Sequence, residues 1–126
     1  MILADTSIWI DHLRLANPTL AGLLSKRLIL VHSFVIGELA MGSLKDRKVI
    51  IENLSGLPVA LKADDDEVLS FVERHRIYAR GVGLVDVHLL ASAKLTAASV
   101  WTRDRRLAGV AEEMGLAAKL PGESTQ

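Results

Sequence analysis

The sequence predicts an α/β fold, namely a three-layer α/β/α sandwich with a mostly parallel central sheet. Short, uninterrupted apolar runs occur at residues 2–4 and 28–31, as is typical of strands buried on both faces of a sheet, and residues 99–102 are predicted to form a further strand. Longer segments with apolar residues at helical spacing separate these runs. Because parallel strands need such helical crossovers, the alternation indicates a parallel sheet covered by helices on both faces.

The first half of the chain is predicted to contain three strands and four helices. Thr6 and Ser7 are suited to cap the first helix, Asn17-Pro18 breaks the chain before the second, and Ser33 is suited to cap the third. Gly42 ends that third helix. The expected order is strand 2–4, helices 8–15 and 19–26, strand 28–31, helices 33–41 and 46–54, and strand 57–61.

The second half is predicted to contain three helices and two strands. The acidic run 64–67 opens a long helix to about residue 79, and we interpret it as helix capping because acids complement the positive helix N-terminus. Gly81-Val82-Gly83 forms a hinge before the next helix. The expected order is helix 64–79, helix 84–93, strand 99–102, helix 105–114 and a last edge strand at 117–120.

The composition fits one domain with an aliphatic core. Of the 126 residues, 50% are hydrophobic and only 4% are aromatic. We expect a single domain over 1–121 and a disordered tail over 122–126. The mean hydropathy of +0.30 is high for a small chain and predicts that a partner or a second copy covers apolar surface. With neither a membrane-length apolar stretch nor a signal-peptide pattern, we expect a cytoplasmic protein without membrane contacts.

Four carboxylates are expected at one edge of the sheet. Asp5 and Asp104 follow strands directly or within a short turn, whereas Glu38 and Asp86 lie in the early turns of helices. In open α/β sheets this carboxyl edge is where ligands bind. Taken singly, each acid also has a structural interpretation: Asp5 as a helix cap, for example, or Glu38 as a surface residue.

Together, the four acids favour a metal site. Their mutual repulsion requires a counter-charge. The chain has no cysteine, and none of its histidines has a second ligand at metal spacing, so oxygen ligands and Mg²⁺ or Mn²⁺ are favoured. Such a site can hydrolyse phosphodiesters by in-line displacement.

The charge distribution allows a polyanionic substrate. Net charge is zero, with 15 basic and 15 acidic residues. Between positions 74 and 106, however, seven basic residues accompany only two acids, Asp86 and Asp104; the basic residues are Arg74, Arg76, Arg80, Lys94, Arg103, Arg105 and Arg106. This stretch suits nucleic acid held near a metal, and a set of solvated helix faces is the alternative.

Four segments carry a further pattern: LADTSIWID at 3–11, VIGELAMG at 35–42, GLVDVHLLASA at 83–93 and WTRDRRL at 101–107. In this order they resemble the signature blocks of the PIN-domain family, and more narrowly the VapC-type toxins of prokaryotic toxin–antitoxin pairs. The match spans nearly the whole chain.

The resemblance implies a Mg²⁺- or Mn²⁺-dependent ribonuclease that forms a homodimer and is silenced by a cognate antitoxin. By position, Asp5 and Asp86 correspond to the family's metal-binding aspartates, and Glu38 and Asp104 complete its acidic quartet. Thr102 matches a hydroxyl residue that supports the site. We also expect a groove around Trp9, Leu13 and Leu39 to receive an amphipathic antitoxin segment.

Three other functions are open at this stage. A receiver-like signalling domain also binds Mg²⁺ at strand ends, but this chain lacks paired acids after the first strand. A haloacid-dehalogenase-like phosphatase needs an acid where Ser7 stands. A nuclease-fold scaffold that binds RNA or protein without cutting is the third.

Overall fold

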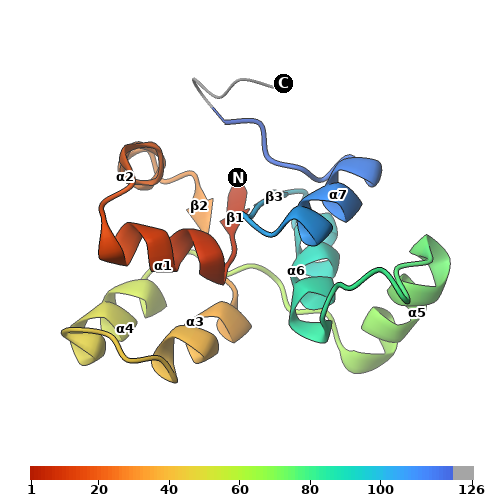
Figure 1. Ribbon diagram of the computed structural model, residues 1–126, viewed down its shortest axis with the longest axis horizontal. Coiled ribbons are helices and arrows are strands. Elements are labelled where there is room, and N and C mark those ends of the chain that lie inside the picture. The colour runs from red at the N-terminus through yellow and green to blue at the C-terminus, as the bar shows by residue number, and fades with distance from the viewer. Residues whose placement is uncertain (121–126) are drawn as a thin grey trace.

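The protein was analysed as a computed structural model that describes residues 1–120, so the predicted tail at 122–126 lies outside the described residues. Three short strands and seven helices make up this part of the chain (Figure 1). In order they are β1 (Ile2–Ala4), α1 (Thr6–Arg14), α2 (Pro18–Ser25), β2 (Ile29–Leu30), α3 (Ser33–Ala40), α4 (Arg47–Ser55), α5 (Asp65–His75), α6 (Leu84–Leu95), β3 (Ser99–Trp101) and α7 (Arg105–Glu113).

The sheet confirms the predicted parallel topology. Its strand order is β2-β1-β3, and β1 pairs in parallel with both neighbours, Leu3 lying opposite Leu30 on one side and Val100 on the other. Leu3 and Ala4 of the central strand are fully buried. The first strand in the sequence is therefore the centre of the fold, and its carboxyl end points to the middle of one sheet edge.

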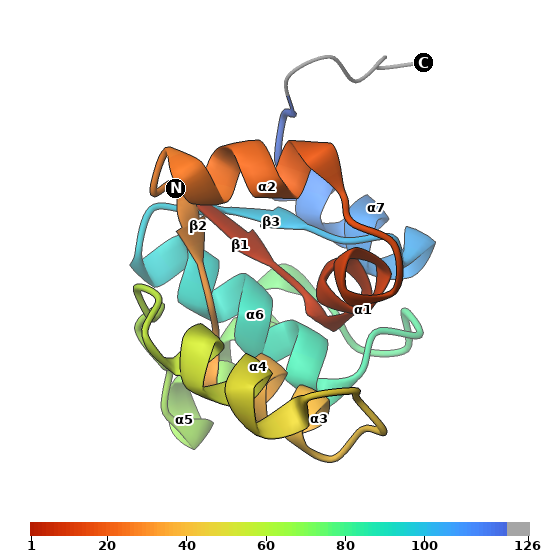
Figure 2. The ribbon, with the colours of Figure 1, turned by 90° about the vertical axis from the view of Figure 1, so that its left-hand side faces the viewer.

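Helices cover both faces of this sheet, which confirms the three-layer arrangement. Figure 2 shows α2 and α7 on one side of the strands, and α6, α3 and α4 on the other. The layers meet in one core, to which Leu20 of α2, Leu90 of α6 and Leu107 of α7 each contribute a fully buried side chain. None of the helices among residues 1–120 is long and apolar enough to cross a membrane.

Two predicted strands are wrong. The segment at 57–61 makes only one parallel bridge, between Val31 and Val59, and the segment at 117–120 makes only one, between Val100 and Ala117. In the first case Val31 N–H donates to the Pro58 carbonyl, and Val31 in turn accepts from Ala60 N–H. Because Pro58 has no N–H, the ladder cannot continue through it.

Helix starts differ from the predicted ones in an informative way. The caps of α1 and α3 are Asp5 and His32, each placed before the hydroxyl residues that the sequence favoured. The acidic run does cap α5, as predicted, through a reciprocal capping box between Asp64 and Glu67. This helix ends at His75 rather than near residue 79 because Arg76 adopts a left-handed backbone conformation, with φ of 52°.

Candidate acidic active site

Asp5 is held rigidly at the carboxyl end of β1. Its residue is only 5% exposed, and its Oδ1 accepts hydrogen bonds from Ser7 Oγ at 2.5 Å and from the Ile8 N–H at 3.2 Å. Its Oδ2 accepts a hydrogen bond from Thr102 Oγ1. A carboxylate oxygen has two lone pairs. Oδ1 is therefore saturated, whereas Oδ2 retains the capacity to bind one more group.

Thr102 joins the ends of β1 and β3. Besides donating to Asp5, its hydroxyl oxygen accepts from the Asp104 N–H at 3.0 Å. Asp104 then caps α7, its Oδ1 accepting from the N–H groups of Arg106 at 2.8 Å and Leu107 at 3.2 Å. No hydrogen bond within residues 1–120 uses its second oxygen, Oδ2. Asp104 thus supports a helix with one oxygen and leaves the other available.

The pKa of Asp86 indicates that the other three acids lie near it. Burial of its carboxyl raises the pKa of Asp86, while a hydrogen bond from the Gly83 backbone lowers it. The negative charges of Asp104, then Asp5, then Glu38 raise this pKa further. Since all three act on one carboxyl, the fold has gathered the four acids that the sequence singled out into one electrostatic unit.

Glu38 is an exposed residue of α3 that a hydrogen bond connects to α1. Its Oε1 accepts a hydrogen bond of 2.6 Å from Thr6 Oγ1 in the first turn of α1. This bond connects α3 to the segment that carries Asp5.

The four acids affect one another through their charges, but they do not form a complete set of metal ligands. Within residues 1–120 no group of three or more Asp, Glu or His side chains is arranged to hold a metal ion. The donors are nevertheless all oxygens, and Asp5 and Asp104 each retain binding capacity, so their chemistry fits Mg²⁺ or Mn²⁺. The shape of the surface does not single out this site: a pocket of about 440 Å³ between α5 and α6 contains none of the four acids.

His32 is a buried polar residue to which the sequence analysis assigned no role. It is fully buried, and its Nδ1 accepts a hydrogen bond of 3.0 Å from the Phe34 N–H. Its Nε2 therefore carries the proton and donates to Ser92 Oγ of α6, also at 3.0 Å. Burial, followed by the charges of His88 and Lys62, lowers the pKa of His32 to about 4. The signal that could have found it is its position, two residues beyond a strand and just before a helix.

The expected groove around Trp9, Leu13 and Leu39 is only partly a surface feature. Trp9 and Leu39 are 3% and 2% exposed and belong to the core. Two pockets of about 400 and 260 Å³ lie on either side of Leu13, the first between α1 and α3 and the second between α1 and α4. Leu13 therefore lines the accessible surface, and the other two form its floor.

The structure defines the class of this protein as a small parallel α/β domain with an acidic site at the carboxyl edge of its sheet. Residues 2–113 match the family described as the PIN domain. Ribonuclease VapC32 of Mycobacterium tuberculosis is 46% identical over 118 residues, which is 93% of this chain and 95% of the relative. The chain therefore belongs to the PIN-domain family and, within it, to the VapC type.

Solved structures share the fold at lower identity. FitAcB from Neisseria gonorrhoeae matches with a TM-score of 0.61 and 22% identity, over 89% of this chain and 94% of the other. PAE2754 from Pyrobaculum aerophilum matches with a TM-score of 0.58 and 18% identity, over 86% and 78%. At these identities the likeness shows the fold alone.

Proposed function

We propose that this chain is a Mg²⁺- or Mn²⁺-dependent endoribonuclease that acts as the toxin of a toxin–antitoxin pair. The observation that carries the proposal is the pKa of Asp86, which the charges of Asp104, Asp5 and Glu38 all raise. Four carboxylates in one unit favour a divalent cation over water alone. The ribonuclease name of the 46% identical relative supports RNA as the substrate.

In this proposal the residues divide into ligands and supports. Asp5 and Asp86 hold the cation, and Glu38 and Asp104 complete the acidic set. When bound, the cation supplies the positive charge that offsets negative charge developing at phosphorus. Thr102 fixes the orientation of Asp5, since its hydroxyl donates to Asp5 and accepts from the Asp104 backbone. The buried position of Asp5 excludes water from one side of the site.

RNA cleavage with and without a chelator tests the proposal. We expect hydrolysis with Mg²⁺ or Mn²⁺, loss of activity in EDTA, and a higher melting temperature when the metal is added without RNA. Asp86→Asn should abolish most activity and most of the metal-induced stabilisation. Asp65→Asn is the matched control, because Asp65 is an exposed acid in the first turn of α5.

Three outcomes would contradict the proposal. Full activity in excess chelator would remove the metal mechanism. Equal losses in Asp86→Asn and Asp65→Asn would show that the four acids were wrongly singled out. RNA binding without any hydrolysis would favour the non-cleaving scaffold instead.

The partners follow from the same assignment. We propose that the surface around Leu13 receives an amphipathic segment of the antitoxin and that a second apolar surface supports a homodimer. Large exposed apolar side chains on α5 and α6 support the second part, including Leu69 at 62% and Leu95 at 48% exposure. Sedimentation should show a dimer without antitoxin. Leu13→Glu should weaken antitoxin binding and leave dimerisation unchanged; Trp9 is too deeply buried to serve as this test.

A further inference from the structure

The helix α7 begins with two arginines, directly after Asp104 of the acidic site. Arg105 and Arg106 follow Asp104 directly, and both are exposed. The Asp104 carboxylate binds the backbone N–H of Arg106, not a guanidinium group. Neither arginine has an ion-pair partner within residues 1–120, whereas nearby Arg80 and Arg103 pair with Glu113 and Asp11. Two exposed cations without a salt-bridge partner in this part of the chain therefore follow directly on Asp104, one of the four acids.

Arg106 has a platform on the loop between α5 and α6. Gly81 in this loop has φ of 75°, and a Cβ there would lie 2.7 Å from Arg106 Cδ and 2.9 Å from its Nη1. The arginine side chain thus crosses the Gly81 backbone, where a Cβ would displace it and where the positive φ favours glycine. This contact gives the Arg106 side chain a defined place against the loop.

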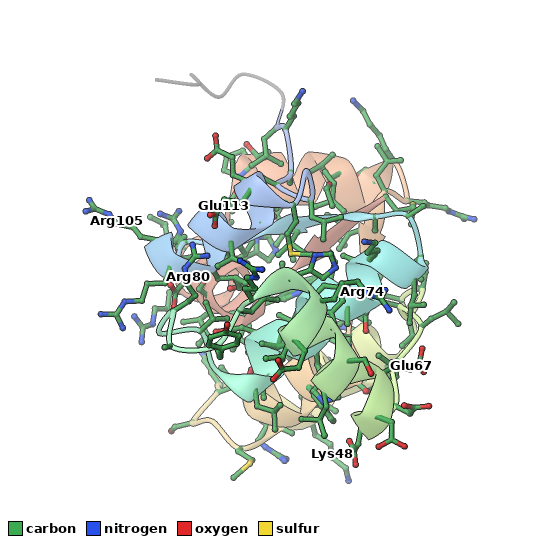
Figure 3. The ribbon with its side chains drawn as sticks, turned by 90° about the vertical axis from the view of Figure 1, so that its right-hand side faces the viewer. Lys48, Glu67, Arg74, Arg80, Arg105 and Glu113 are labelled. Carbon is green, nitrogen blue, oxygen red and sulfur yellow. The ribbon has the colours of Figure 1, made fainter. Side chains whose placement is uncertain are left out.

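The same loop is attached to α7 a second time. Arg80 Nη2 contacts Glu113 Oε2 at 2.5 Å, near the other end of the helix. Figure 3 shows Arg80 and Glu113 together beside α7, with Arg105 extending outward on the same side. Because the loop leads into Gly83 and Asp86, the platform of Arg106 and the acidic site belong to one connected structure.

We propose that Arg105 and Arg106 bind RNA phosphates that flank the scissile one, with Gly81 orienting Arg106. This rests on the proposed function for the substrate class. Guanidinium groups suit phosphate because they donate two parallel hydrogen bonds. Phosphodiesters are preferred over the carboxylates of an acidic peptide because the proposed hydrolysis acts on phosphodiesters, and an acidic peptide is therefore one arm of the test.

The test measures binding, not cleavage. Anisotropy of a short single-stranded phosphorothioate RNA is titrated against NaCl in the presence of Mg²⁺. We expect Arg105→Gln and Arg106→Gln each to weaken binding about tenfold at low salt and to reduce the slope of log K against log salt by about 0.7, the value for one single-strand phosphate contact. Lys48→Gln is the matched control, because Lys48 is an exposed cation on α4, away from α7 in Figure 3.

A double-mutant cycle tests the platform. Gly81→Ala should reduce the salt slope as Arg106→Gln does, and should have no further effect in the Arg106→Gln background. Arg106→Lys keeps the charge but loses the fork, so it should recover only part of the binding. Thermal unfolding of each variant separates lost binding from lost fold.

Three results would overturn the inference: unchanged salt slopes in both glutamine variants, an equal loss in Lys48→Gln, or binding of a polyglutamate peptide with the same dependence on both arginines. These results are independent of the proposed hydrolysis. A chain that cuts RNA with unchanged slopes refutes only this inference, and a chain that binds through these arginines without cutting refutes only the nuclease.

Discussion

The ends of β1 and β2 lie side by side in the sheet, and a buried titratable residue follows each of them. Asp5 caps α1 and His32 caps α3, so the two residues do the same structural work. Their remaining atoms differ in use. Asp5 keeps one oxygen with spare capacity toward the acidic site, whereas both ring nitrogens of His32 are engaged, one by Phe34 and one by Ser92.

This difference separates a strand end that can still bind a further group from one whose polar atoms are all engaged within the fold. A carboxylate surrounded by donors can cap a helix and still bind another group. A neutral imidazole with two hydrogen bonds has no lone pair left for a metal. His32 instead ties α3, which carries Glu38, to α6, which carries Asp86. In the proposed function the first residue binds the cation, whereas the second connects the two helices that carry Glu38 and Asp86.

Of the changes that test this contrast, Asp5→Asn should have the largest effect, and the effect should be on the cleavage rate. Asparagine is also a good N-cap, so the fold should persist. The ligand charge is lost, and we expect cleavage to fall more than about 100-fold, since changes to residues that merely orient metal ligands already have effects of about 10- to 100-fold. Initial rates and thermal unfolding check this. A variant that keeps a tenth of the activity would show that Asp5 acts only as a cap.

His32→Ala should have the reverse profile, a large loss of stability with little direct effect on chemistry. Loss of the cap lowers the unfolding free energy by about 1 kcal/mol. Leaving the buried Ser92 hydroxyl unpaired lowers it by about 1–3 kcal/mol more. Urea unfolding should show the sum, and His32→Asn, which retains a capping oxygen, should restore part of it. If folded His32→Ala protein had lost activity as fully as Asp5→Asn, the assignment of a structural role would be wrong.

Acid should lower the stability of the fold through protonation of His32 in the unfolded chain. His32 has a pKa of about 4 in the fold against 6.5 in the unfolded chain, so the unfolded chain binds more protons between these values. The neutral His32 therefore contributes fully to the free energy of unfolding above pH 6.5. This contribution is lost as the pH falls toward 4, and the loss reaches at most about 3 kcal/mol.

Urea unfolding at about pH 7.5 and about pH 5 measures this loss. Burial also lowers the pKa of His88, which acts in the same direction, so His32→Asn is needed to isolate the part due to His32. An identical pH dependence in that variant and in the unchanged chain would contradict the prediction.

The contrast also shows what the sequence could and could not predict. The positions of Asp5 and Asp104 at the carboxyl edge of the sheet were predictable, because each comes after a predicted strand and the parallel topology brings strand ends to one edge. The position of Asp86 near that edge was predictable from its place at the start of a helix. His32 was not predictable as a cap, because Ser33 is the better intrinsic capping residue and only the tertiary contact with Ser92 favours the imidazole.

Strand lengths were the least predictable feature. The segment at 57–61 has the composition of a strand, yet it forms a single bridge. Apolar composition reports burial, whereas a ladder also requires backbone N–H groups facing a partner, and Pro58 has none. The hydrogen bond that connects Glu38 to Thr6 was likewise unpredictable, because the two residues are distant in sequence.

Thr102→Val should have the smallest effect of the four predictions. It tests whether a change near Asp5, at the end of β1, leaves the role of His32, after β2, unchanged. Valine keeps the volume of threonine but removes the hydroxyl that donates to Asp5 and accepts from the Asp104 N–H. We expect cleavage to fall about 10- to 100-fold, the range for groups that orient metal ligands. Thr102→Ser should recover most of the rate, because it retains the oxygen.

The pH dependence of stability that stems from His32 should be the same in Thr102→Val as in the unchanged chain, since no hydrogen bond links Thr102 to the His32–Ser92 pair within residues 1–120. Cleavage rates and urea unfolding of the same preparations measure both properties. A change in the acid sensitivity of unfolding would mean that the ends of β1 and β2 are coupled. In that case the division between a chemical and a structural strand end would not hold, because one substitution would alter both.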